Sequence, residues 1–116
     1  MDARLFAPEP IGLREQLQSR PLAERFVLDA ARLRLHIDFS GLHVGDSATV
    51  VAIDAEVRRL LAGLGQRVSV VVNYDHFSIA PELADTYATM VQALTQEHYT
   101  AVQRYGTVGF LKTLLG

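Results

Sequence analysis

The chain has 116 residues, of which 49% are hydrophobic and 21% charged; its net charge is −2 and it has no cysteine. This length suits one domain with its own core, and the composition is that of a folded protein rather than a disordered one. The cations are dispersed along the chain, which argues against a nucleic-acid binder. The lack of cysteine excludes disulfides and thiolate metal sites. No apolar run approaches the ~20 residues of a membrane span. Because no signal-like segment opens the chain either, we expect a cytoplasmic protein that binds neither nucleic acid nor membrane.

The first part of the chain lacks a sustained hydrophobic period. Residues 1–20 contain Pro8, Pro10 and Gly12, and we expect them to form an extended arm or linker. We expect residues 21–116 to form a single α/β domain. Its first element is a short helix over residues 21–25, because proline suits the first helical position.

A β-hairpin is expected next, with its first strand over residues 26–28 and its turn over residues 29–32. Along the second strand, residues 33–39, apolar and polar side chains alternate. This period of two places one set in the core and the other towards solvent. The two sets are Leu33, Leu35, Ile37 and Phe39, and Arg34, His36 and Asp38.

A loop over residues 40–45 precedes the first long helix. Asp46 or Ser47 can cap that helix by accepting a hydrogen bond from its first free amides. Apolar residues then recur at intervals of three and four, and Gly63 and Gly65 are expected to end the helix. The apolar stripe consists of Val50, Ile53, Val57, Leu60, Leu61 and Leu64.

The β-branched run over residues 68–72 predicts a central strand that is covered on both faces, as in the middle of a parallel sheet. Pro81 then begins a helix, a short strand covers residues 100–103, and Thr107 caps a last helix. The apolar positions of these two helices are Leu83, Tyr87, Met90, Val91 and Leu94, and Phe110, Leu111, Leu114 and Leu115.

These elements predict the α/β class, with a small mixed sheet of about four strands packed with helices. Strand–helix–strand connections require parallel pairing and a right-handed crossover. The element order is similar to that of STAS-like domains, a resemblance of layout that implies no particular function.

Polar side chains follow the central strand, where α/β proteins commonly place their functional loops. Asn73, Tyr74, Asp75 and His76 form this constellation. It can be a rim that contacts a ligand or a partner domain. Alternatively, Asn73 and Asp75 bond loop amides while Tyr74 and Phe77 close the core. The sequence leaves both interpretations open.

Four further groups of residues are weighed as sites. Ser78 either caps the following helix or offers the phosphorylatable serine that the resemblance to STAS-like regulators implies. Arg104, which precedes Tyr105, either pairs with Asp75 or recognises a CoA phosphate. A hydrolase or isomerase using His76 with Asp75 is a weaker alternative. His36 and Asp38 share a strand face near which His43 or His76 could lie, but nothing fixes a third ligand, so no metal site is predicted.

Nearly the whole chain resembles the C-terminal extension of bacterial acyl-CoA:acetate/3-ketoacid CoA-transferases of the propionate CoA-transferase type, together with the segment before it. That extension reads N-Y-D-x-F, an acidic helix ending in tyrosine, R-Y-T-T-x-x-F and a final L-G. Residues 2–10 resemble the segment that joins it to the catalytic part. The matching residues are Asn73, Tyr74, Asp75, Phe77, Pro81, Glu82, Leu83, Tyr87, Met90, Val91, Tyr99, Arg104, Tyr105, Phe110, Leu115 and Gly116.

The resemblance implies a non-catalytic accessory domain, because the glutamate that carries the acyl group and then CoA in such enzymes lies in an E-N-x-G context that this sequence lacks. No catalytic, cofactor-binding or metal residue is therefore predicted here; CoA thioesters would bind the catalytic part, which is the expected partner. Self-assembly is a further expected role. A free-standing STAS-like module that binds a protein or a small anion is the alternative. Gly106 departs from the pattern, because the extension has threonine there.

Overall fold

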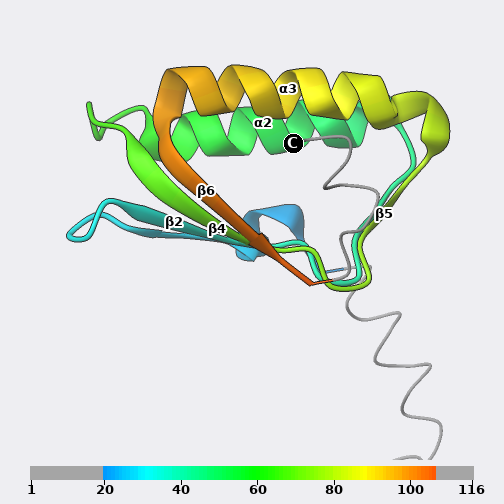
Figure 1. The fold of residues 1–116 in the computed structure, drawn as a ribbon, viewed down its shortest axis with the longest axis horizontal. Helices are drawn as coiled ribbons and strands as arrows, with labels where there is room; N and C mark the ends of the chain where they lie inside the picture. Colours follow the sequence, from blue (N-terminus) through cyan, green and yellow to red (C-terminus); the bar gives the residue numbers. More distant parts are fainter. Residues whose placement is uncertain (1–19, 107–116) are drawn as a thin grey trace, which may run out of the picture.

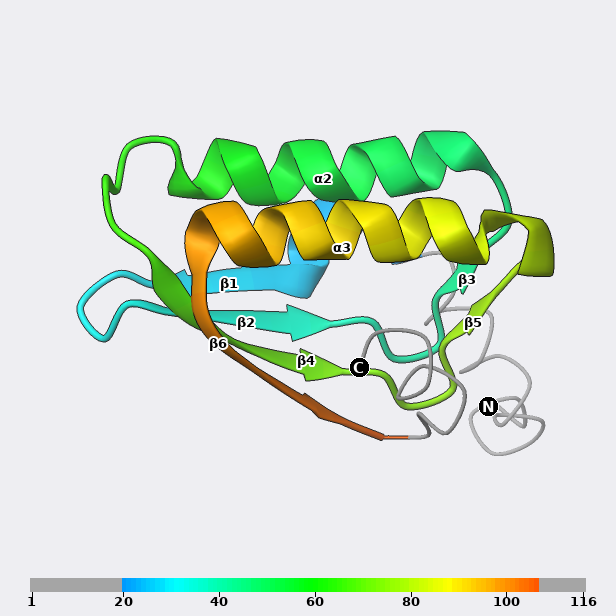
Figure 2. The same ribbon diagram turned by 45° about the horizontal axis from the view of Figure 1, so that its top comes forward.

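Four strands form one mixed sheet in the order β1 (Phe26–Asp29), β2 (Arg34–Asp38), β4 (Val68–Asn73) and β6 (Tyr99–Tyr105), and a separate two-stranded sheet pairs β3 (His43–Val44) with β5 (Ser78–Ile79) (Figures 1 and 2). A computed structural model describes residues 20–106 of the chain. The four-stranded mixed sheet and its two long helices confirm the predicted α/β class. The elements in chain order are η2 (Leu22–Arg25), β1 (Phe26–Asp29), β2 (Arg34–Asp38), β3 (His43–Val44), α2 (Ser47–Leu61), β4 (Val68–Asn73), β5 (Ser78–Ile79), η3 (Pro81–Leu83), α3 (Ala84–His98) and β6 (Tyr99–Tyr105).

The N-terminal hairpin has the predicted alternation of buried and exposed side chains. β1 and β2 are antiparallel, and Phe26 pairs with Ile37. Leu35 and Ile37 are buried, whereas Arg34 and His36 are exposed. The period of two therefore fixes which face of the hairpin enters the core.

The remaining strand pairs of the large sheet are parallel, and a helix crosses over between each pair. β2 pairs with β4 through α2, and β4 pairs with β6 through α3. Figures 1 and 2 show α2 and α3 side by side on the same face of the sheet. The chain advances in one direction across the sheet, so two right-handed crossovers place both helices on one side.

The prediction that β4 is covered on both faces is wrong. Its burial alternates: Val68, Val70 and Val72 are buried beneath the helices, whereas Ser69 and Val71 on the other face are half-buried. A continuous β-branched run does not reveal how many faces of a strand are covered, because valine suits a half-buried strand as well.

Helix α2 begins at Ser47 and is capped by Asp46, one of the two predicted caps, whose side chain accepts a hydrogen bond from the Thr49 amide at 2.9 Å. Its apolar stripe faces the sheet, and two leucines of the predicted stripe, Leu60 in α2 and Leu64 just beyond it, are partly buried against the core. Helix α3 follows the turn η3 without a side-chain cap, and Tyr87 and Leu94 are its large buried residues. The fully buried positions of α2 are Val50, Ile53, Val57 and Leu61.

Several elements differ from the predicted ones. β6 spans Tyr99–Tyr105 and so exceeds the expected residues 100–103 at both ends. His43–Val44, expected in a loop, forms β3 and pairs in parallel with β5. Ser78 lies in β5 and does not cap the next helix, since η3 begins at Pro81, and its N-cap residue, Ala80, provides no side-chain hydrogen bond. The helix expected from Thr107 lies outside the described residues. Within residues 20–106, no helix is long and apolar enough to cross a membrane.

Candidate functional site

The carboxyl ends of β2, β4 and β6 meet at one edge of the sheet, together with the start of the antiparallel β1. The structure divides the predicted site residues among three environments at this edge. Asn73 joins a polar cluster on the sheet, Tyr74 is buried with the half-buried Arg104 beside it, and Asp75, His76, Ser78 and Tyr105 lie towards the surface.

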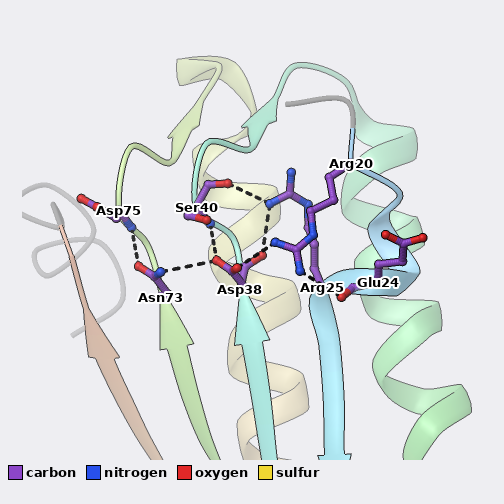
Figure 3. Close-up of polar contacts among 7 residues, drawn as sticks. All are labelled: Arg20, Glu24, Arg25, Asp38, Ser40, Asn73 and Asp75. Carbon is purple, nitrogen blue, oxygen red and sulfur yellow. Dashed lines mark hydrogen bonds and ion pairs between the residues drawn. The ribbon is translucent and has the colours of Figure 1, made fainter. Parts of the chain in front are cut away.

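A polar cluster of Arg20, Arg25, Asp38, Ser40 and Asn73 is centred on the Asp38 carboxylate (Figure 3). One oxygen of this carboxylate accepts from the Ser40 amide at 3.0 Å and from the Asn73 side-chain nitrogen at 3.4 Å. The other oxygen accepts from the Arg20 guanidinium at 2.8 Å. Burial alone would raise the pKa of Asp38, but the hydrogen bonds from Ser40 and Arg20 outweigh burial and lower the pKa.

Arg25 is the buried cation of this polar cluster and is only 1% exposed. Its Nη1 donates to the backbone carbonyls of Asp38 at 3.1 Å and of Ser40 at 2.9 Å. Burial lowers the pKa of its guanidinium, and the nearby charge of Arg20 adds to that effect, whereas Asp38 opposes it. Because a buried charge needs hydrogen-bonded partners, Arg25 fixes the path of the loop after β2.

Asn73 connects the loops that follow β2 and β4. Its side-chain oxygen accepts from the Asp75 amide at 2.9 Å, which confirms the predicted loop-closing role of Asn73. The backbone continues the connection, since the Phe39 amide donates to the Asn73 carbonyl and the Gly41 amide donates to the Asp75 carbonyl, each at 2.9 Å. The two loops therefore form one rigid unit.

Tyr74 and Tyr87 form the interior group. Both side chains are buried, and their hydroxyls are 2.7 Å apart. Phe77 packs edge-to-face against Tyr74 with ring centroids 4.9 Å apart, so Tyr74 and Phe77 close the core as the structural interpretation predicted. Burial is the main cause that raises the pKa of both tyrosines, and the charge of Arg104 partly opposes it. Arg104 thus faces this hydroxyl pair rather than Asp75, which corrects the predicted ion pair.

His76, Asp75 and Tyr105 form the outer part of the edge. His76 has a left-handed backbone with φ 60° and a side chain that is 68% exposed, and its Nε2 lies 3.9 Å from a carboxylate oxygen of Asp75. Tyr105 is 53% exposed. A histidine this exposed lacks the enclosed setting in which a hydrolase would hold its base, so the geometry suits a contact surface better than a reaction centre.

The small second sheet brings together two residues that are distant in the sequence. His43 Nδ1 lies 2.7 Å from the Ser78 hydroxyl, and the two residues pair across β3 and β5. Both residues are exposed. Ser78 is therefore accessible. It lies in β5, however, and not at a helix N-terminus, which is where the hypothesis of a phosphorylatable serine placed it.

No group of three or more histidine, cysteine, aspartate or glutamate side chains within residues 20–106 is arranged to hold a metal ion. His43 lies on the second sheet with Ser78, not on the strand face of His36 and Asp38. The two-ligand arrangement considered from the sequence therefore gains no third ligand in the described part of the chain.

Two surface hollows lie on opposite sides of the sheet–helix sandwich. The one beside the polar cluster has a volume of about 270 Å³ and is lined by residues including His36, Asn73 and Tyr105. The wider hollow, about 580 Å³, lies between α2 and α3 and includes Val51 and Met90. Only the hollow beside the polar cluster is lined by predicted site residues. The larger hollow, between α2 and α3, therefore does not coincide with the predicted site.

Replacement of Asp38 by asparagine is expected to cost on the order of 1 kcal/mol at neutral pH, since the carboxylate receives charge-assisted hydrogen bonds. Because the folded-state pKa of Asp38 lies below its usual value, the ionised carboxylate stabilises the fold above the unfolded pKa near 3.8, and this contribution disappears as the pH falls through the folded pKa. Urea unfolding at several pH values should show the two proteins converging below pH ~4. The exposed Glu82→Gln change is the control; a constant difference down to acidic pH would contradict this role.

Comparison of the chain with protein-family models, with curated proteins and with solved structures gives no significant match. The function must therefore be inferred from the residues and their arrangement.

Arg20, Arg25 and Asp38 are central to the observed cluster but were not among the predicted site residues. Arg20 was assigned to the arm and Arg25 to a short helix, and neither follows a hydrophobic period. The one available signal was an arginine directly before Phe26, the first residue of a strand, where a cation must either reach solvent or find buried acceptors.

Proposed function

We propose that the chain is a non-catalytic accessory domain of a CoA-transferase, whose parent reaction moves CoA from an acyl-CoA to a small carboxylate. Its role is to pack on the catalytic part or to assist assembly of the enzyme in the cytoplasm. The observation that supports this best is the place of the residues that carry the resemblance. Tyr74, Phe77, Tyr87 and Tyr99 are all buried, and Arg104 adjoins the first of them.

These motif residues preserve an interior rather than expose reactive groups. Aromatic contacts link Phe39, Tyr74, Phe77 and Tyr87 between the sheet and α3. A motif of this kind specifies the packing of the domain interior, and a correctly folded domain is what an accessory role requires. The resembling residues can thus be accounted for by their packing in the core, without a catalytic role in this chain.

The described glutamates also suit a surface role. Glu56 pairs with Arg59, and Glu97 pairs with Arg58 at 2.6 Å, and these arginines lower the pKa of both carboxyls. A carboxylate that forms a covalent thioester must instead be free to attack an acyl carbon in an enclosed site. In the proposal, that glutamate and the CoA thioester both belong to the catalytic part.

The carboxyl edge of the sheet is the proposed contact surface. Asp75, His76 and Tyr105 project there beyond the rigid pair of loops. Arg20, where the described chain begins, pairs with Asp38 at the same edge. A catalytic part joined through the arm would therefore enter beside this surface, and contact would require little reordering of the loops.

A free-standing STAS-like module that recognises a protein or a small anion is the second candidate. The observation in its favour is the layout, with a hairpin followed by two parallel crossovers whose helices share one face. Layout alone indicates no partner, so this candidate ranks below the first.

In the enzyme that carries this domain, His76→Ala should weaken assembly and leave turnover per assembled enzyme within about twofold, since a rim contact is worth ~1 kcal/mol or less. Light scattering after gel filtration measures assembly, and a CoA-transfer assay measures turnover. Gln92→Ala, on the exposed side of α3, is the matched control and should change neither. Loss of turnover with normal assembly would instead indicate a catalytic histidine.

A further inference from the structure

A small, incompletely enclosed cavity lies between the sheet and the two helices. Its volume is about 30 Å³, and aliphatic and aromatic side chains form most of its wall. The polar groups that line it belong to Tyr74, Tyr87, Tyr99 and Arg104. Arg104 lies on the edge strand β6, at the register position of Val72 on β4, and its Nε is buried.

Two hydrogen-bond donors beside this cavity form no hydrogen bond with the residues that the structure describes. Tyr74 and Tyr87 share one hydrogen bond, in which one hydroxyl donates and the other accepts. Because burial raises the pKa of both tyrosines, each retains its proton at neutral pH, and the accepting hydroxyl still has a hydrogen to donate. The Nε–H of Arg104 is a second donor, and it has no hydrogen-bond partner among the described residues.

Neither donor has an acceptor in hydrogen-bond geometry within residues 20–106. Arginine only donates, so Arg104 cannot accept from the tyrosines; Arg104 lies close enough to Tyr74 to lower the pKa of Tyr74, but its Nε–H forms no hydrogen bond with either hydroxyl oxygen. Tyr99 forms no hydrogen bond with the tyrosine pair or with Arg104 in the described part of the chain, and the rest of the wall is hydrocarbon. The Arg104 Nε–H and one tyrosine hydroxyl hydrogen therefore border one cavity without a hydrogen bond to any described residue, an arrangement that native proteins avoid or fill.

We propose that this cavity is a binding site for one buried water molecule, which accepts from Arg104 Nε–H and from the free hydroxyl hydrogen of the Tyr74–Tyr87 pair. The volume is sufficient for one water, and buried waters typically make about three hydrogen bonds. Tyr99 lines the same cavity and can provide the third partner for a hydrogen that the water donates. An apolar occupant would leave both donors unpaired.

The site gives Arg104 a role that does not depend on the proposed function. Through the water, the cation of the edge strand is connected to the hydroxyl pair that joins β4 to α3. Arg104 is then a positioning residue of the interior, which explains why an arginine can face the helix side of the sheet without an acidic partner at hydrogen-bond distance.

A high-resolution crystal structure of the full chain tests the proposal. The expected result is a density peak in the cavity at about 2.7–3.2 Å from Arg104 Nε and from one tyrosine oxygen. A second crystal soaked in bromide should give no anomalous peak there. An empty cavity, a bromide peak, or an Arg104 side chain turned to solvent would each overturn the proposal.

Two variants sharpen the test. Arg104→Met keeps an unbranched side chain but removes the donor, so the water peak should disappear; Gln103→Met, at the exposed neighbouring position of β6, should retain it. In solution, magnetisation transfer from a long-lived bound water to nearby core protons should be present in the parent and in Gln103→Met and absent in Arg104→Met. If Arg104→Met does not fold, the parent crystals still decide the question; a water that persists in Arg104→Met would contradict the role of Arg104.

Discussion

Replacement of Val57 by aspartate is expected to unfold the domain. Val57 is 0% exposed and lies on the face of α2 that packs on the sheet. A carboxylate there has no partner, and keeping it neutral at pH 7 instead costs about 4 kcal/mol, because its ordinary pKa is near 4. With the lost packing added, the total approaches the ~5–15 kcal/mol by which domains of this size are stable.

Thermal unfolding followed by circular dichroism measures this effect. Val51→Asp is the matched control, because it makes the same change on the same helix at a side chain that is 66% exposed. The control should retain the parent transition within a few degrees. The deficit of Val57→Asp should also shrink at pH 4, where its carboxyl protonates more readily. An unchanged transition for Val57→Asp would mean that α2 does not pack as described.

Replacement of Gly106 by threonine, the residue found here in the resembled extension, is expected to destabilise this chain by more than about 2 kcal/mol. Gly106 has φ 102°, and a Cβ built on it lies 2.5 Å from the Asp75 amide nitrogen and 2.9 Å from the Tyr74 carbonyl carbon. Backbone atoms cannot yield as a flexible side chain does. The end of β6 must then separate from the loop after β4, which breaks the 2.8 Å bond from the Tyr74 amide to the Tyr105 carbonyl.

Gly63 provides the control for this change. A Cβ there meets no atom within 4 Å, so Gly63→Ala should be neutral or stabilise by up to ~1 kcal/mol through the unfolded state. Chemical denaturation of the parent and of both variants gives the comparison. Equal stability of Gly106→Thr and the parent would show that the chain can follow the resembled pattern without the observed close approach.

Elements with a long hydrophobic period could be predicted from the sequence. The hairpin, the cap at Asp46 and the stripe of α2 follow from spacing alone, because burial acts on one face of each element. The β3–β5 sheet could not be predicted in this way. Each of its strands has two residues, too few for a period, and their pairing depends on the connection between two distant loops.

The site was predicted only in part, and the reason is again physical. Asn73 and Tyr74 stand next to a recognisable strand, so their positions were evident. The hydrogen bonds that Asp38 makes with Arg20 and Asn73 join residues 18 and 35 positions apart. Local patterns carry no information about such pairs. Arg104 was expected to follow a strand over residues 100–103, but β6 continues through Tyr105. Arg104 is therefore a strand residue beside the buried Val72, and its Nε is buried.

Sequencing of the gene upstream of codon 2 tests the central proposal most directly. The proposal predicts that the reading frame continues upstream, through the joining segment, into a polypeptide that contains a glutamate in an E-N-x-G context. An in-frame stop codon immediately upstream, with no such glutamate encoded, would contradict the accessory-domain proposal and favour the free-standing module.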